Sequence, residues 1–201
     1  MLLTEVAPVP AGALPVARLR DHLRLGGGFA DDAVQDGLLE GQLRAALAVV
    51  EGLTGKAVLA REMQLVLNGW DVTAGVALPV APVASVVSVT LRDGAGAGTA
   101  MAAESYRLRQ DAHVPAIEPV AAYLPALPEG GTAEIRFVAG WPDWDAVPPD
   151  LAQAVLLLAA HYHEERHAAG GGDGAAAVPF GIQALLARWR RLRLTAGGAP
   201  R

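Results

Sequence analysis

The chain opens with apolar positions that recur at the spacing of an α-helix. These positions are Val16, Leu19 and Leu23. They follow Pro15, and proline suits the first turn of a helix because its φ angle is already helical. The glycines at 26–28 end the pattern. A first helix is therefore predicted from residue 16 to about residue 25, after a Pro- and Ala-rich arm over residues 1–15.

A second and longer stripe has the same period. Its apolar positions are Val34, Leu38, Leu39, Leu43, Ala46, Leu47, Val50 and Leu53. The two aspartates at 31–32 suit the positive end of a helix dipole, and Gly55 suits a left-handed end. Gly37 and Gly41 leave a bare patch on which another helix could approach closely. A helix is predicted from about residue 31 to residue 54.

The middle of the chain changes to the period of a β-strand. Met63, Leu65 and Leu67 alternate with polar residues, as in a strand with one buried face. Further strand segments are predicted at 83–91, 106–108, 116–118 and 133–138. Prolines and glycines separate these segments, and Asp93-Gly94 is a typical turn pair. We expect five or six strands in this region.

Helical spacing returns after Pro148 and Pro149. A third helix is predicted with Asp150 in its first turn and an end near His167, and a short last helix over about 182–192. The order predicts an α+β fold: a helical bundle of about four helices with an inserted antiparallel β subdomain between the second and third helices. The expected parts are an extended N-terminal arm (1–15), a helical core (16–60 and 147–181), the β subdomain (61–146), and a C-terminal helix with a basic tail (182–201).

Composition supports a folded protein and narrows its chemistry. The 201 residues are 52% hydrophobic and 18% charged, with a net charge of −5, so disorder is not expected. The acidic balance gives the whole molecule no electrostatic reason to bind nucleic acid or an anionic membrane. The absence of cysteine excludes disulfides and thiolate metal sites, and fits a reducing cytoplasm. We expect a soluble protein without a signal peptide or membrane span.

One short motif suggests an enzyme. Residues 163–167 read HEERH, the pattern in which two histidines one helical turn apart bind zinc. His163 and His167 would be the ligands, Glu164 the general base, and Asp173 the third ligand at a spacing similar to that of metzincins.

The surrounding residues argue against this chemistry. Glu165 and Arg166 are charged, whereas a zinc-binding helix is usually buried behind its ligands. No glutamate follows Glu165, and the methionines all precede the motif, so neither a thermolysin-type ligand nor a methionine turn is available. We therefore expect no catalytic residues, no metal and no cofactor, and keep a zinc metallopeptidase as the alternative.

The C-terminal segment is basic and aromatic. From residue 188 to residue 201 it has five arginines and no acidic residue. Arginine and tryptophan are favoured at interface hot spots, although they also interleave in single-strand DNA sites. A partner protein, direct contact with DNA, and cations that match a helix dipole all stay open. The candidate partner-binding residues are Ile182, Leu185, Leu186, Arg188, Trp189, Arg190, Arg191 and Arg193.

Several segments together resemble the head–tail connector proteins of tailed phages. The opening helices, VARLRDHLRL and DDAVQDGLLEGQLRAALAVVEGLTGKAV, are similar to the start of that family, and LPVAPVASVVSVTLRDGAG resembles its proline-framed hairpin. IRFVAGW, VPPDLAQAVLLLAAHYHEERH and VPFGIQALLARWRRLR resemble its closing strand and last two helices. The resemblance covers about residues 15–194. Ala, Gly and Pro are abundant and Lys56 is the single lysine, a pattern that suggests a GC-rich bacterial coding sequence. This favours the adaptor of a bacterial gene transfer agent within the family, with a phage adaptor as the alternative.

The resemblance implies a non-enzymatic adaptor. Such proteins form a ring, usually of twelve copies, beneath the capsid portal protein, where they extend the DNA channel and receive the next connector, the stopper. The expected location is the head–tail junction of a virion or phage-like particle assembled in the bacterial cytoplasm, with DNA as passing cargo and no membrane contact. The family's C-terminal segment reaches the portal, which maps onto residues 182–201. A DNA-binding accessory protein that uses the arginine tail stays open as a further alternative.

Overall fold

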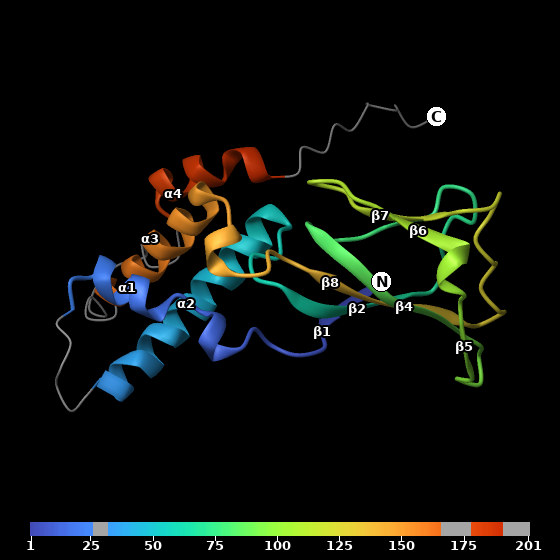
Figure 1. The fold of residues 1–201 in the computed structure, drawn as a ribbon, viewed down its shortest axis with the longest axis horizontal. Coiled ribbons are helices and arrows are strands. Elements are labelled where there is room, and N and C mark those ends of the chain that lie inside the picture. The colour runs from blue at the N-terminus through green and yellow to red at the C-terminus, as the bar shows by residue number, and fades with distance from the viewer. Residues whose placement is uncertain (26–31, 166–177, 191–201) are drawn as a thin grey trace, which may run out of the picture.

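The computed structural model describes residues 1–25, 32–165 and 178–190 (Figure 1). Within these residues the α-helices are α1 (Val16–His22), α2 (Asp32–Thr54), α3 (Pro149–Glu165) and α4 (Phe180–Leu186). Short 3₁₀ helices are η1 (Ala11–Ala13), η2 (Ala103–Ser105), η3 (Trp144–Ala146) and η4 (Ala187–Trp189). Described strands are β1 (Leu2–Glu5), β2 (Arg61–Leu67), β3 (Val76–Ala77), β4 (Val83–Arg92), β5 (Gly98–Ala100), β6 (Tyr106–Arg109), β7 (Ala116–Pro119) and β8 (Thr132–Ala139). The fold is α+β.

The first three helices begin where the sequence predicts. α1 follows Pro15, and α3 starts at Pro149 with Asp150 in its first turn. α2 ends at Thr54, and Gly55 takes a φ of +66°, the left-handed conformation that glycine adopts at low cost. The predicted end of α3 near His167 lies outside the described residues. Proline and glycine are strong signals here because they act on the backbone itself.

The strands form two antiparallel sheets. The larger sheet has the order β1-β2-β8-β4-β5, and the smaller has the order β3-β7-β6. Strands β2, β4, β6, β7 and β8 match the predicted segments. The expected five or six strands in the middle of the chain are too few, because β3 and β5 bring the described strands there to seven; β1 lies outside that region, at the N-terminus. β3 and β5 are two and three residues long, too short to show an alternating pattern.

The N-terminal residues pack against the rest of the chain. β1 pairs with β2 at the sheet edge, with Leu3 opposite Leu65. After β1 the chain crosses to α2, where Arg44 Nη1 donates a 2.9 Å hydrogen bond to the carbonyl oxygen of Val9. Val9 and Leu14 are buried in the helical core. Residues 1–15 therefore contribute to both the sheet and the helical core.

The buried apolar side chains form two clusters. One lies among α1–α4 and includes Leu39, Leu43, Val155 and Leu158. The other lies among the strands; its members include Met63, Leu65, Ile135 and Phe137. Figure 1 shows the helices gathered at one end of an elongated molecule and the strands at the other. We call these two parts the helical lobe and the β lobe.

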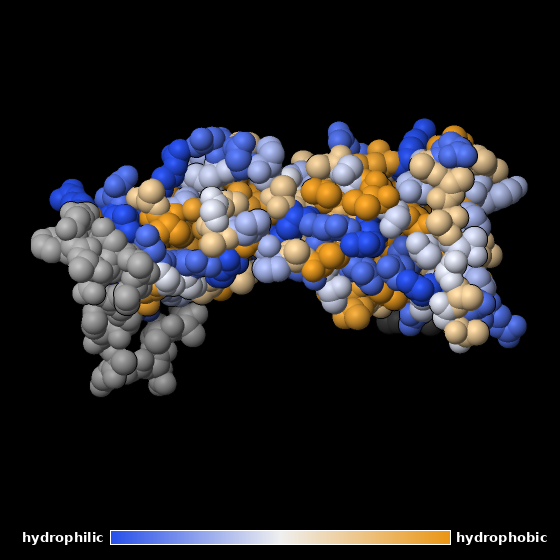
Figure 2. Space-filling model, turned by 60° about the horizontal axis from the view of Figure 1, so that its bottom comes forward, coloured by the Kyte–Doolittle hydropathy of each residue, from blue (hydrophilic) through white to orange (hydrophobic). Residues whose placement is uncertain are grey.

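One face of the β lobe has a polar stripe. Figure 2 shows a hydrophilic band across the β lobe with apolar patches on both sides. On the larger sheet, Arg136 and Glu62 form an ion pair of 2.8 Å, and Arg92 and Glu134 form one of 2.9 Å. None of the described helices is long and apolar enough to cross a membrane.

The bare patch on α2 is open in the described chain. A Cβ atom added at Gly37 or Gly41 would meet no other heavy atom within 4 Å. The close helix approach that these two glycines permit is therefore not made by any part of the chain that the structure describes.

Candidate partner-binding site at the C-terminal helix

The candidate site is residues 178–190, which we call the C-terminal arm. Its helix α4 starts two residues earlier than the predicted start at Ile182, directly after Pro179. Gln183 Nε2 donates a 2.8 Å hydrogen bond to the carbonyl oxygen of Val178, which supports this first turn. At Ala187 the α-helix gives way to η4. The remainder of the predicted helix, through residue 192, includes residues outside the described range.

The two faces of α4 have different roles. Ile182 is 3% exposed and Leu186 is 0% exposed, since both belong to the helical core. Leu185 is partly buried against the same core. These three candidate partner-binding residues contact their own chain and position the arm. Their direct contact with a partner stays a prediction.

The outward face of α4 carries a residue that the sequence reasoning missed. Phe180 is 86% exposed, the largest exposed fraction among the large apolar side chains described. Ala184 follows four residues later and is also exposed, so the two share one face of α4. Arg188, in η4, is exposed as well. Helical spacing from Phe180 would have found this face, but the predicted helix began after it.

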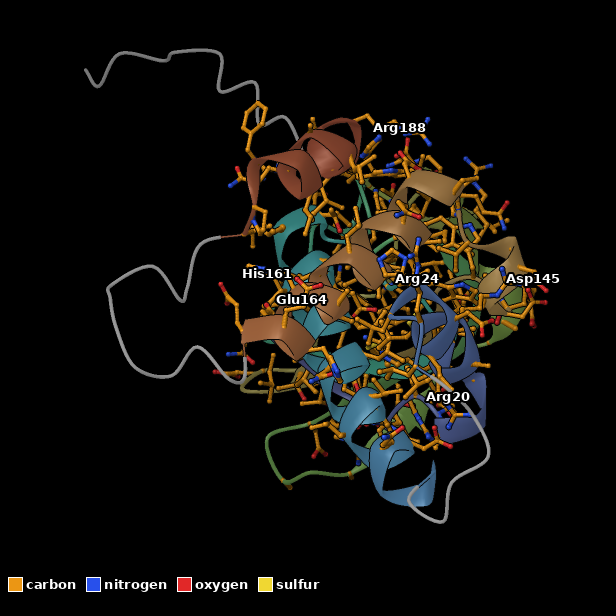
Figure 3. The ribbon with its side chains drawn as sticks, turned by 90° about the vertical axis from the view of Figure 1, so that its left-hand side faces the viewer. Arg20, Arg24, Asp145, His161, Glu164 and Arg188 are labelled. Carbon is orange, nitrogen blue, oxygen red and sulfur yellow. The ribbon has the colours of Figure 1, made fainter. Side chains whose placement is uncertain are left out.

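Asp150 joins the arm to the start of α3. Arg188 Nε lies 2.6 Å from Asp150 Oδ2, and Arg188 Nη2 lies 2.9 Å from Oδ1. Trp189 Nε1 donates a 2.7 Å hydrogen bond to Oδ2. Burial by itself raises the pKa of Asp150, but the hydrogen bonds from Arg188 and Trp189 and the charge of Arg188 outweigh it, so the pKa lies below its ordinary value. The carboxylate thus stays ionised and holds two consecutive side chains. Figure 3 shows Arg188 near the outer end of α4.

The indole of Trp189 is held by three further groups. Its ring lies edge-on to that of Trp141, with 6.0 Å between centroids. The guanidinium carbon of Arg188 is 4.6 Å from the Trp189 centroid, and Lys56 Nζ is 5.9 Å from it, within the range of cation–π attraction. Lys56 is 1% exposed, and its Nζ also donates to the carbonyl oxygen of Ala112. Trp189 therefore links the arm to both lobes.

Of the three remaining basic candidates, the structure describes Arg190. Arg190 is partly buried and follows η4. Arg191 and Arg193 lie outside the described residues. Their contribution to partner binding stays a prediction that rests on their charge.

The described part of the HEERH motif has other contacts. His163 Nδ1 lies 3.1 Å from Gln42 Oε1, and His161 Nε2 lies 3.2 Å from Glu165 Oε1. Glu164 is exposed (Figure 3). Residues 1–25, 32–165 and 178–190 contain no group of three or more His, Cys, Asp or Glu side chains able to hold a metal ion. His167 and Asp173 lie outside the described residues.

Comparison with known proteins places the chain in a family. No family model and no curated protein matches the chain. Among solved structures, it is similar to a chain in the neck of an empty gene transfer agent particle computed with C6 symmetry (48% identity, TM-score 0.85). It is also similar to a chain in the virion of a native gene transfer agent particle (50%, 0.84) and to one in a native neck computed with C12 symmetry (48%, 0.80). Each match covers 98% of this chain and 99% of the other. The chain therefore belongs to the family of head–tail connector proteins found in gene transfer agent particles.

Proposed function

We propose that the chain is the adaptor subunit of a gene transfer agent, a structural protein that acts by assembly. Copies form a ring beneath the capsid portal, extend the DNA channel, and link the head to the next connector (stopper) and the tail. The observation that supports this is 48–50% identity over nearly the whole length of both chains. The site of action is the head–tail junction of a phage-like particle assembled in the bacterial cytoplasm.

We propose rings of twelve copies. Similar chains occur in necks that have C6 and C12 symmetry. In such a ring each subunit meets its two neighbours through two different surfaces. In this arrangement the helical lobe is a bundle, and strands β2 to β8 are a subdomain inserted between α2 and α3, to which β1 adds an edge strand.

The C-terminal arm is the proposed portal contact. Its exposed side chains include the aromatic ring of Phe180 and the guanidinium of Arg188, two groups favoured at binding hot spots. The arginines at 190, 191 and 193 add positive charge, which favours an acidic partner surface. Ile182 and Leu186 hold the helix in place from its inner side.

DNA is proposed as passing cargo. The chain has a net charge of −5. An acidic channel wall does not bind DNA that moves through it, because it has few positive side chains to pair with phosphate. This charge favours a protein partner for the arm over DNA.

Two surface variants test the portal contact. Phe180→Ser removes the exposed aromatic side chain without touching the core, and should weaken binding to purified portal protein by at least about tenfold, ~1.4 kcal/mol. Tyr123→Ser is the matched control, because Tyr123 is also an exposed aromatic residue (67%) but follows β7 in the other lobe.

Particles carrying Phe180→Ser should accumulate as filled heads without tails. Equal portal binding by Phe180→Ser and wild type would exclude this face of α4 as the portal contact. Loss of binding only in Tyr123→Ser would mean that the β lobe, and not the C-terminal arm, contacts the portal.

A further inference from the structure

The C-terminal arm combines strong local contacts with little stability of its own. α4 has seven residues, well below the length at which an isolated helix is stable in water. Its helical form therefore depends on docking against α3. Two sets of contacts make that docking. Ile182 and Leu186 are buried in the helical core, and the Asp150 carboxylate of α3 accepts hydrogen bonds from Arg188 and Trp189 at the end of the arm.

The polar end of this docking is accessible from outside. The Arg188 side chain is 65% exposed although both of its bonds go to Asp150. The Asp150 side chain is 21% exposed, so the pair is half-buried, and its net contribution to stability is modest because water solvates Arg188 when the pair opens. A second carboxylate arriving from solvent can replace Asp150 as the partner of Arg188 at small cost. Trp189 adds a hydrogen bond to the same carboxylate oxygen that Arg188 Nε uses.

We propose that Asp150 is a releasable latch: it holds Arg188 and Trp189 on α3 in the free subunit, and an acidic surface of the docking partner draws Arg188 away and frees the arm. The release by a partner rests on the proposed function, whereas the latch itself does not. Opening of the latch removes Trp189 from Trp141 and from Lys56.

The chain contains a built-in probe of this opening. Lys56 is its single lysine, and the Nζ atom lies buried behind the Trp189 ring. Ala112 and His113 also contact the Nζ atom, so we expect an amine-reactive acetylating reagent to label Lys56 slowly in the closed form and faster when the arm opens. The α-amino group at Met1 reacts separately, and peptide mass mapping distinguishes the two products.

The first experiment uses the full-length protein alone. Asp150→Asn should raise the acetylation rate of Lys56 about tenfold, which corresponds to ~1.4 kcal/mol in the opening equilibrium. Arg188→Gln should raise it similarly, since it removes the other half of the pair. Asp145→Asn is the control, because Asp145 also pairs with an exposed arginine, Arg18, in the helical lobe. In this variant Lys56 should be acetylated at the wild-type rate.

Hydrogen exchange on the same samples separates a latch from a general support of the fold. Faster exchange confined to residues 178–190 in Asp150→Asn is the expected result. An unchanged Lys56 rate in Asp150→Asn, or faster exchange throughout both lobes, would overturn the latch.

Portal binding tests the second half of the proposal. With the latch removed, Asp150→Asn should associate with portal protein faster than wild type, because less energy is needed to free the arm. Slower association by an open Asp150→Asn arm would show that the docked arm is the binding form, and would overturn release. Absence of portal binding in every variant, including wild type, would remove the proposed function and leave the Lys56 result standing.

Discussion

Trp189 stands edge-on to Trp141, with ring planes at 85° and centroids 6.0 Å apart. Trp141 follows β8, and Trp189 is the last residue of η4. The two rings connect the end of the larger sheet to the C-terminal arm. An edge-to-face pair places the positive edge of one ring against the negative face of the other, which adds to the energy of burial.

A double-mutant cycle should measure this pair. Trp141→Leu and Trp189→Leu together should destabilise the protein by about 1 kcal/mol less than the sum of the two single variants, since the pair can be lost only once. Urea unfolding followed by circular dichroism gives the three values. Trp70→Leu combined with Trp189→Leu is the control and should be additive, because Trp70 donates to the carbonyl oxygen of Pro125 in the β lobe. Additivity in the Trp141 cycle would contradict the predicted coupling.

Arg61 should be among the most costly side chains to replace. Its guanidinium is 6% exposed and lies 2.6 Å from Glu51 Oε2 and 2.8 Å from Glu5 Oε1. Burial lowers the pKa of Arg61, but the hydrogen bond and charge of Glu51 and those of Glu5 outweigh it, so the pKa lies above its ordinary value. Arg61→Met leaves the largely buried Glu51 carboxylate (side chain 16% exposed) without its cation, and should cost about 3 kcal/mol in unfolding free energy.

The matched control for Arg61 is Arg107→Met. Arg107 also pairs with a glutamate, Glu118, but its side chain is 68% exposed. That variant should change stability by less than about 1 kcal/mol. Equal costs for the two variants would show that burial does not decide the effect of these ion pairs.

The pair between Asp150 and Arg188 predicts an acid-sensitive contribution to stability. The folded-state pKa of Asp150 is lowered, so its contribution is present above the unfolded value of about 3.9 and is lost as pH falls through the folded value. The stability difference between wild type and Asp150→Asn should therefore be constant above about pH 5 and shrink below about pH 4. In an Arg188→Gln background, this pH dependence should become smaller. If the stability difference between wild type and Asp150→Asn grew on acidification, its sign would contradict the predicted role of this pair.

Zinc should have no effect on the protein. His163 Nδ1 faces the Gln42 side chain, and no metal cluster occurs within the described residues. The Tm measured with added zinc should equal the Tm measured with a chelator. Glu164→Gln should leave this Tm unchanged. A zinc-dependent rise in Tm that His163→Ala abolishes and His22→Ala retains would instead favour the metallopeptidase.

Two glycine substitutions should act in opposite directions. Gly41→Ala lies in the exposed interior of α2 with free space around the added Cβ, and should stabilise the subunit by about 0.5–1 kcal/mol. Gly75 has a φ of +80°, and an added Cβ would lie 2.1 Å from the carbonyl oxygen of Ile117, so Gly75→Ala should destabilise. Chemical denaturation of both variants provides the comparison, and destabilisation by Gly41→Ala would mean that the α2 face is not free in solution.

The long elements were predictable because their signals are local. The start of α3 at Pro149 and the end of α2 before Gly55 follow from the backbone restrictions of proline and glycine. β2 alternates buried and partly buried residues along its whole length, so its period alone identifies it. By contrast, β1 lies in a segment without that alternation, and exists because β2 offers it a free edge.

The composition of the C-terminal segment was predictable, but the contacts of its side chains were not. The sequence by itself determined the helix order, the head–tail connector family, and a C-terminal segment rich in Arg with one Trp, since each depends on residue type and spacing along the chain. Only the tertiary structure decided that Ile182 and Leu186 face inward, that Phe180 faces outward, and that Arg188 and Trp189 meet Asp150. Asp150 and Arg188 are 38 positions apart, and no local pattern links two residues at that separation. Their contact depends on how α3 and α4 pack, which is a property of the whole core.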